Sequence, residues 1–550
     1  MKKLSLATVA ILALLGLSSC SSAPETPLEV SPTGSYNKKD PGELRQGGTL
    51  TLPIAEIPEQ QNALHANSTA PVSTLWGWYM PQMFYSDSEG NPTPNPNFLL
   101  DARAEVVGGK TVVHYALNPQ ASFNDGTPID WRSYENTWRI SRGDDDAYQI
   151  SSSDGYNLIE SVRPGENDKQ VVVTYKHIYP WWNGLFSQLL HPGISTPEDF
   201  NEGFLQRLPN EYGAGPYKVG AVDYPGGTVT FVPNERWWGA APKLDRVVFR
   251  QMEAQASINA FRAGEIDSVS LGNKNHLAAA LGMGKQAELH TALDTTYSLL
   301  SLNSRSPLLN DVTVREAVVS GIDRALLATI LFNGRGYSED LPGSMTFLQN
   351  QEGYRDVFGE LVSFDPDHAR ELLDQAGWKP SRDGIRAKHG ERMVLRYPLF
   401  SDTSTGKAVA TSLQKMLRDI GVELKIEARP AADFARVLEE QDFDLIDSMV
   451  VQNDPNGTAY FRQQYYSDST LNLSGTGTAE VDAMIDELEK LPTAEEQNAR
   501  AIEIEKVALS RFGLVPYANG PKTVAVKPGL ANVGSLIFGS VPKEEIGWVR

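Results

Sequence analysis

The segment LNPQASFNDGTPI, residues Leu117–Ile129, is the most informative stretch of the chain for its fold. It follows an alternating run, Val112–Leu117, that is typical of a β-strand, and Asn118-Pro119 marks a turn where that strand ends. Asp125-Gly126 suits a second, tighter turn with a positive φ, and Pro128 stiffens the chain beyond it. The segment therefore predicts a strand followed by a compact, rigid loop.

Helical and strand patterns alternate on both sides of this segment. Val171–Tyr175 and Val422–Ile426 are rich in β-branched residues and predict strands. Asp365–Gly377 predicts a helix, in which Asp365 is the N-cap, Pro366 stands in the first turn and Gly377 ends the last one. The mixture predicts an α/β architecture, and 550 residues suggest two or more domains or lobes.

The N-terminus has the layout of a secretory signal. Met1–Lys3 is positively charged, Leu4–Leu17 is apolar and uncharged, and Leu17-Ser18-Ser19-Cys20 follows. The apolar stretch is shorter than the roughly 20 residues that span a bilayer. Cys20 is the only cysteine of the chain and its surroundings resemble a bacterial lipobox. We interpret residues 1–19 as a signal peptide and Cys20 as the site of lipidation, the alternative being an ordinary signal with a chance cysteine.

Residues 20–46 have the composition of a flexible tether, rich in Ser, Pro, Thr, Gly and charge. Ordered structure is expected to begin at Gly47. A lipid with two acyl chains on Cys20 is sufficient for stable anchoring. We therefore expect an exported protein on the outer face of the cytoplasmic membrane, or on its periplasmic side where an outer membrane exists.

The charge and the motifs exclude several classes of function. A net charge of −20 argues against nucleic acid and against electrostatic docking on anionic lipid. The chain has no nucleophile elbow, no phosphate-binding loop and no metal-ligand spacing among its eight histidines. A Ser-x-x-Lys tetrad, Ser412–Lys415, lies inside the helical pattern Lys407–Ile420 without its partner motifs. We predict no enzyme, no cofactor and no bound metal.

Several segments in order resemble family 5 of the extracellular solute-binding proteins, the peptide- and nickel-binding class of ABC importers. Leu117–Ile129 is similar to the family's Phe-x-Asp-Gly-Thr-Pro signature, and the general style of the chain is closest to an actinobacterial branch. The other matching segments are Gly213–Val219, Pro233–Gly239, Pro242–Val247, Ala263–Asp267, Val314–Ala317, Gly321–Arg324 and Asp365–Gly377.

The resemblance implies a two-lobed α/β fold of the large peptide-binding type, with a ligand cleft between the lobes. Lobe I would hold residues 47–295 plus 512–550, with an inserted subdomain around 87–205. Lobe II would hold residues 296–511. The two crossing segments are expected near Leu299–Asn303 and Phe512–Tyr517.

The resemblance also implies a function. A monomer would capture oligopeptides or a related small solute by closure of its lobes and deliver it to an ABC permease and ATPase complex. The same branch includes a mycobacterial lipoprotein tied to phosphatidylinositol mannoside synthesis. A regulatory envelope lipoprotein linked to glycolipid synthesis is therefore the alternative, because a fold does not settle function.

Two groups of residues are candidates for ligand contact. Trp76, Trp78 and Tyr79 lie in a region that faces the cleft in relatives, although they can equally be core residues. The second group is Gln452, Asn453, Asp454 and Tyr460, after a predicted strand.

In peptide-binding relatives the loop of this second group carries an Asp that pairs with the peptide's α-ammonium. Here Gln452 or Asn453 would take that place, which favours a sugar hydroxyl, an amide or a glycolipid headgroup over a cation. Asp454 can alternatively form an Asx turn before Pro455.

Overall fold

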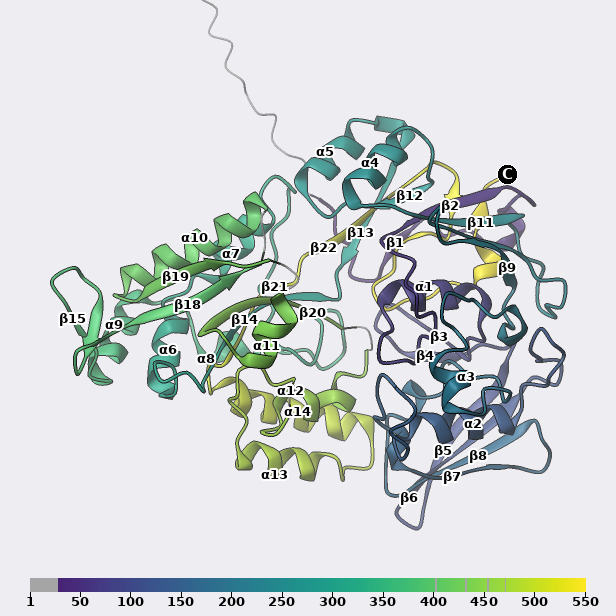
Figure 1. Ribbon diagram of the computed structural model, residues 1–550, viewed down its shortest axis with the longest axis horizontal. Coiled ribbons are helices and arrows are strands. Elements are labelled where there is room, and N and C mark those ends of the chain that lie inside the picture. Colours follow the sequence, from purple (N-terminus) through teal and green to yellow (C-terminus); the bar gives the residue numbers. More distant parts are fainter. Residues whose placement is uncertain (1–27, 401–402, 431–432, 453–454, 470) are drawn as a thin grey trace, which may run out of the picture.

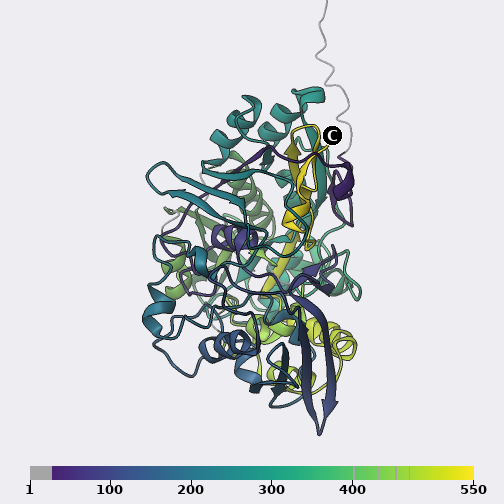
Figure 2. The ribbon, with the colours of Figure 1, turned by 90° about the vertical axis from the view of Figure 1, so that its right-hand side faces the viewer.

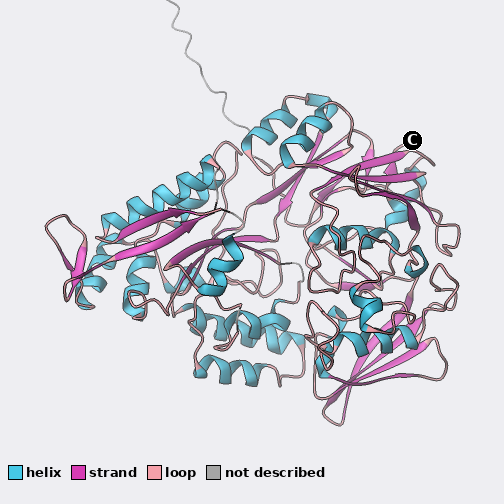
Figure 3. Cartoon of the chain, viewed as in Figure 1, coloured by secondary structure: helices cyan, strands magenta, loops and turns pink. Residues whose placement is uncertain are grey.

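The computed structural model describes residues 28–400, 403–430, 433–452, 455–469 and 471–550. They form two lobes that lie side by side, with the C-terminus in the lobe on the right of Figure 1. Both lobes combine helices and sheets, as Figure 3 shows, which confirms the predicted α/β class. In the described part of the chain, no helix has the length and apolar character to cross a membrane.

The main sheet of lobe I has a filled apolar face. Its strand order is β2, β11, β10, β9, with β2 parallel to β11 and the other pairs antiparallel. Val229 and Phe231 alternate on β10 and pack on the same core as Phe249 of β11. The elements are β2 (Thr49–Ile54), β9 (Tyr217–Asp223), β10 (Thr228–Pro233), β11 (Arg246–Gln251) and the covering helix α1 (Ala70–Tyr79).

A second sheet of lobe I leads into the segment Leu117–Ile129, which follows its strand β6. Phe123 N–H donates to Thr127 O at 2.8 Å, Asp125 Oδ1 accepts from Thr127 N–H at 2.8 Å, and Gly126 has a φ of 98°. The strand followed by a tight turn is therefore confirmed. The sheet order is β5 (Leu99–Val107), β6 (Lys110–Leu117), β8 (Gln170–Tyr175), β7 (Ile159–Pro164), with α2 (Trp131–Ser141) packed on it. Figure 2 shows the long β5–β6 hairpin at the lower edge of the molecule.

The C-terminal part of the chain returns to lobe I. Strand β22 (Pro521–Val526) lies between β12 (Ser268–Ser270) and β13 (Glu288–Leu293), next to α4 (Ala254–Arg262) and α5 (Lys274–Leu281). Smaller elements of this lobe are β1 (Ser35–Tyr36), β3 (Phe84–Ser86), β4 (Pro92–Pro94), α3 (Pro197–Asn201), β23 (Leu530–Ala531), β24 (Gly534–Ser535) and β25 (Gly547–Trp548). Because β1 pairs with β24 and Leu44 is buried, ordered structure begins before Gly47, and the predicted tether over residues 20–46 was too long.

Lobe II is built on a three-stranded antiparallel sheet, β20 (Leu445–Val451), β14 (Thr296–Leu302), β21 (Leu514–Ala518), and on a parallel pair, β18 (Val394–Leu399) and β19 (Glu423–Ala428). Its helices are α6 (Val312–Ser320), α7 (Arg324–Leu331), α8 (Val357–Leu361), α9 (Pro366–Gln375), α10 (Ser404–Asp419), α11 (Phe434–Glu440), α12 (Phe461–Tyr465), α13 (Ala479–Leu488) and α14 (Ala494–Leu509). A small three-stranded antiparallel sheet is formed by β15 (Lys379–Pro380), β16 (Arg386–Lys388) and β17 (Glu391–Arg392).

Helix α9 follows the predicted pattern. Asp365 accepts hydrogen bonds from the N–H groups of Asp367 and His368 at 3.0 and 2.9 Å, and Gly377 has a φ of 86°. In α10 the Ser-x-x-Lys tetrad is helix surface, because Lys415 is exposed and pairs with Asp419 at 3.6 Å.

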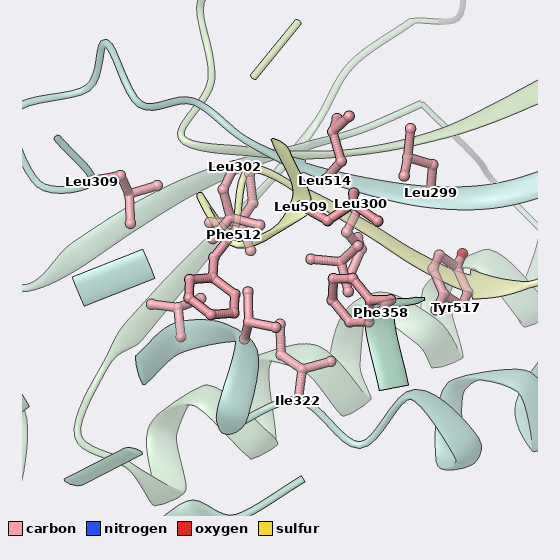
Figure 4. Packing of buried hydrophobic residues seen from close by; sticks show 14 of the residues in the cluster. Leu299, Leu300, Leu302, Leu309, Ile322, Phe358, Leu509, Phe512, Leu514 and Tyr517 are labelled. Atoms are coloured by element: carbon pink, nitrogen blue, oxygen red, sulfur yellow. The ribbon is translucent and has the colours of Figure 1, made fainter. Parts of the chain in front are cut away.

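The crossings between the lobes differ from the expected ones. Leu299–Leu302 and Phe512–Tyr517 lie within lobe II, whose core includes Leu300, Phe512 and Tyr517 (Figure 4). The chain changes sheet at Asp294–Thr295 and at Asn519–Gly520 instead. There Gly520 O accepts from Asp294 N–H at 3.1 Å, and Glu339 accepts from the N–H groups of Asn519 and Gly520 at 2.7 Å each. The predicted crossings were too far into lobe II because their apolar patterns belong to sheet strands.

Candidate ligand-binding site

A cavity of about 570 Å³ lies on lobe II, over one face of the sheet formed by β20, β14 and β21. This volume is in the range of small-molecule sites. Because side chains alternate along a strand, Leu299 and Ser301 of β14 point to this face together with their neighbours Ser448 and Val450 on β20. Figure 4 shows Leu299 on the side of the strands opposite to Phe358, which lies in the lobe II core.

Three polar atoms on the cavity wall have no hydrogen-bond partner among the described residues. They are Ser301 Oγ, Ser448 Oγ and Gln452 Oε1, and all three are buried. A buried polar atom without a partner costs about 1–3 kcal/mol, so native structures rarely leave one unsatisfied unless water or a ligand completes it. Three such atoms on one cavity therefore mark a place for a hydrogen-bonding ligand.

The wall formed by Gln452 is fixed by the neighbouring loop. Gln452 Nε2 donates to Met345 O at 3.1 Å and to Thr346 O at 3.4 Å, which turns its amide oxygen away from these carbonyls. Its backbone N–H donates to Thr295 O at 2.9 Å, beside the crossing segment. The orientation of the unpartnered Oε1 is thus set by protein contacts, and Met345 itself lines the cavity.

A buried carboxylate holds this loop in place. Glu505 of α14 is fully buried and accepts hydrogen bonds from the N–H groups of Met345 and Thr346 at 2.8 and 3.1 Å. It also accepts from the hydroxyls of Ser344 at 2.7 Å and Tyr465 at 2.7 Å. Burial raises the pKa of Glu505, while these donors act in the opposite direction. One side chain therefore joins the loop, α12 and α14, which together support the cavity.

The remaining wall comes from α11 and from the end of β20 and the region after it. The described lining residues include no Asp, Glu, Lys, Arg or His. The side chains that complete it are those of Leu438, Val451, Tyr460, Gln463, Gln464, Leu471 and Leu473.

A second cavity, of about 330 Å³, lies between the lobes and has a different lining. Gln463 lines both cavities and also donates to Asp154 of lobe I. Arg462 faces the second cavity and forms an ion pair with Glu489 at 2.8 Å. Asp468, His177 and Tyr179 complete its ionisable groups. The charged cavity is thus bounded by both lobes, and the uncharged one by lobe II.

The lobes touch on both sides of this space. Trp181 Nε1 donates to Gln497 Oε1 at 2.7 Å, with both side chains buried. On the other side, Gln351 Nε2 donates to Glu89 O at 3.2 Å. The turn between β3 and β4 lies in close contact with lobe II. A Cβ on Gly90 of this turn would overlap the side chain of Pro455. The described conformation is therefore closed.

The aromatic residues predicted to face the cleft lie in the core of lobe I. Trp76 is fully buried and its Nε1 donates to Gln61 O at 2.6 Å. Trp78 packs edge-on against Tyr217 with ring centroids 5.4 Å apart, and Tyr79 stacks on Phe231 at 6.0 Å.

None of these three side chains lines the two cavities just described. They belong to α1, which covers the main sheet of lobe I, so large apolar rings are taken up by packing.

Of the second predicted group, Gln452 and Tyr460 line the uncharged cavity. Asn453, Asp454 and the lipidation candidate Cys20 lie outside the described residues. Sequence reasoning missed Ser301 and Ser448. The only available signal was a hydroxyl within an apolar strand pattern, which does not reveal whether the space above the strand is filled.

Comparison with known proteins supplies the wider context. A sequence model described as bacterial extracellular solute-binding proteins, family 5 middle, matches residues 95–472. The oligopeptide-binding protein OppA of Mycobacterium tuberculosis is 30% identical over 97% of this chain and 92% of its own length. The probable monoacyl phosphatidylinositol tetramannoside-binding protein LpqW of the same species is 25% identical over 61% of this chain and 58% of its own.

Among solved structures, the periplasmic EDTA-binding protein EppA superposes with a TM-score of 0.84 at 23% identity. The superposition covers 96% of this chain and all of that one. At this identity the likeness establishes the fold, which is the two-lobed fold of periplasmic binding proteins.

Proposed function

The chain belongs to family 5 of the bacterial extracellular solute-binding proteins, and on this premise we propose that it is the substrate-binding lipoprotein of an ABC importer that takes up oligopeptides. The family is one of binding proteins and not of enzymes. The observation that carries the proposal is the lobe II cavity, where three buried polar atoms have no described partner.

Peptides suit this cavity chemically. A peptide offers an N–H donor and a C=O acceptor at every residue, together with side chains that can fill apolar space. The similarity to OppA over almost its whole length supports the same ligand class. Gln452 and Tyr460 are our candidates for direct contact with the ligand in the lobe II cavity. Asn453 and Asp454 are candidates for contact from the adjoining loop, with a different position of the ligand.

Capture would proceed by closure of the two lobes. A ligand stabilises the closed state by binding it more tightly than the open one. The contacts of Trp181 with Gln497 and of Gln351 with Glu89 add to the closed state without any charge. We propose that the crossing segments at Asp294–Thr295 and Asn519–Gly520 act as the hinge.

Delivery requires the protein to stay near its permease. We propose that residues 1–19 are removed on export and that Cys20 is lipidated, so that the N-terminal segment links lobe I to the membrane. The part of this segment from Ser35 to Leu44 packs on lobe I and is not a free tether.

The test is ligand release from the soluble chain starting at Ser21. The protein is purified without refolding, and native mass spectrometry before and after denaturation identifies what it carries. We expect a set of short peptides. We also expect added peptide to stabilise the ligand-free protein against heat, by about 2.7 kcal/mol at a hundredfold excess over Kd. A carried sugar or glycolipid, or no stabilisation by any peptide in a random library, would refute the proposal.

The match to LpqW supports a second candidate, a regulatory lipoprotein of envelope glycolipid synthesis. This function predicts that the mature chain binds a mannosylated phosphatidylinositol and does not co-purify with a permease. The same mass-spectrometric experiment distinguishes the two, because peptides and glycolipids differ in mass and fragmentation.

A further inference from the structure

We infer that the lobe II cavity receives one uncharged, apolar side chain of the ligand together with the amide next to it, and that it rejects acidic and basic side chains at that position. This inference rests on the proposed function and adds to it a specificity. It concerns the part of the peptide that enters lobe II, since the cavity of about 570 Å³ is bounded by that lobe.

The apolar part of the cavity comes from several elements. Leu299 of β14, Val450 of β20 and Leu514 of β21 form its floor, and Met345 and Leu438 stand beside them. Apolar groups of a ligand gain by leaving water for such a surface. Because the floor is made of sheet strands, it does not depend on a loop for its shape, and a ligand side chain meets a preformed surface.

The polar part of the cavity requires a neutral partner. Gln452 Oε1 can only accept a hydrogen bond, because its NH₂ group is already committed to Met345 O and Thr346 O. A peptide N–H is a matching donor. Ser301 Oγ and Ser448 Oγ can both donate and accept, so they fit the carbonyl that accompanies this N–H.

A charged ligand side chain would lose its hydration here without compensation. Burial of an ion is unfavourable unless an opposite charge or several hydrogen bonds replace the water. The described lining of this cavity offers no ionisable group except the phenol of Tyr460. In the neighbouring cavity Arg462 is engaged in an ion pair with Glu489 at 2.8 Å.

The test uses synthetic peptides of one length in which each position is varied in turn among Leu, Phe, Lys and Asp. The mature soluble chain, stripped of carried ligand, is titrated by calorimetry. We expect one position at which Leu and Phe bind at least about tenfold more tightly than Lys and Asp, with weak preferences elsewhere.

A variant then tests whether this cavity is the cause. Gln464 lines the cavity and its side chain is partly exposed. Gln464→Glu adds a carboxylate without a change of size. We expect affinity for the Leu peptide to fall about tenfold and affinity for the Lys peptide to rise. The control is Gln375→Glu at the exposed end of α9, which makes the same charge change far from the cavity and should leave both affinities unaltered.

The outcomes distinguish a failure of the side-chain preference from a failure of peptide binding itself. Peptides that bind without preference at any position, or a Gln464→Glu variant that weakens Leu and Lys peptides equally, would overturn the inference and leave peptide binding intact. No binding of any peptide by the wild-type chain would instead overturn the proposed function. A Lys preference in the wild-type chain would reverse the assigned specificity.

Discussion

Lobe I and lobe II differ in how tightly their side chains pack where the ligand is expected. In lobe I the large rings of Trp76, Trp78 and Tyr79 are packed against the main sheet. In lobe II small and medium side chains, Ser301 and Ser448 among them, leave a cavity above the sheet. The difference teaches that an aromatic cluster is a poor indicator of a binding site in this protein. Burial of an aromatic ring removes a large apolar surface from water, so such rings are usually found in a packed core. Small residues on a strand leave space above the sheet that a ligand can fill.

The first prediction concerns lobe I, in which the aromatic rings of α1 are packed in the core. Trp76→Ala removes a fully buried ring and its hydrogen bond to Gln61 O, and should lower the free energy of unfolding by about 3–5 kcal/mol. Chemical denaturation monitored by circular dichroism measures this. Peptide affinity of the folded fraction should stay unchanged.

Leu471→Ala is the matching change in lobe II, at the rim of its cavity. Leu471 is 63% exposed on the cavity rim, so its loss should change stability by no more than about 0.5 kcal/mol while it weakens peptide binding. If the Trp76→Ala variant were as stable as the wild type but unable to bind peptide, Trp76 would be a ligand contact and not a core residue of lobe I.

The second prediction concerns the support of the cavity. Glu505→Gln places an NH₂ group where two backbone N–H groups and three hydroxyls now point at a carboxylate, so at least one buried donor loses its partner. We expect a loss of about 1–3 kcal/mol in stability and a parallel loss of peptide affinity, because the Met345–Thr346 loop moves.

Denaturation and calorimetry on the same protein sample measure both quantities. Glu503→Gln is the control, since Glu503 lies in the same helix but is 65% exposed in its side chain. Equal effects of the two substitutions would contradict a positioning role for Glu505.

The third prediction concerns the contact between the lobes. Gly90→Ala introduces a methyl group into the space held by Pro455 of lobe II, so the lobes cannot close as far. We expect Kd for peptide to rise about tenfold, which is about 1.4 kcal/mol, and the liganded protein to show a larger radius of gyration in solution scattering.

Gly353→Ala is its matched control. Gly353 has a φ of 89°, close to the 92° of Gly90, but a Cβ there would meet nothing within 4 Å. The two variants share the same backbone strain, so a difference between them isolates the lobe contact. Identical affinities would show that the turn at Gly90 does not contribute to closure.

The smallest effect is expected from pH. Asp447 lies on β20, and Tyr517 Oη donates to both of its carboxyl oxygens at 3.0 Å. Burial raises its pKa from 3.8 to about 7. The folded state therefore holds a proton that the unfolded state has lost between about pH 4 and pH 7, so stability falls as pH rises through this window.

Asp447→Asn should remove this part of the pH dependence. Melting temperatures at pH 4.5 and pH 8 should show the variant gaining on the wild type as the pH rises. A constant difference between the two proteins would contradict the raised pKa.

Much of the fold follows from local pattern. The turn at Phe123–Thr127, the capped helix α9 and the strands β8 and β19 were all predictable, because caps, turns and alternation are properties of a few adjacent residues. The family motifs extended this to two lobes. Of the candidate site, Gln452 and Tyr460 were predicted and line the cavity.

The crossings and the cavity floor were not predictable in the same way. Leu299–Leu302 and Phe512–Tyr517 read as connecting segments, yet both pair within one sheet across more than two hundred residues of sequence. Strand pairing at that separation leaves no local mark, so the change of sheet at Asn519–Gly520 could be located only in the folded chain.

The sequence by itself determined the α/β class, the turn chemistry and the neutral character of the residue that follows β20, since each depends on the residues in one segment. Tertiary structure decided which side chains face an empty space. Trp76 and Ser301 are both buried. Trp76 is packed in the core of lobe I, whereas Ser301 lines the cavity of lobe II. Whether a buried position meets packed atoms or a vacancy depends on how distant elements come together, and no adjacent residue encodes it.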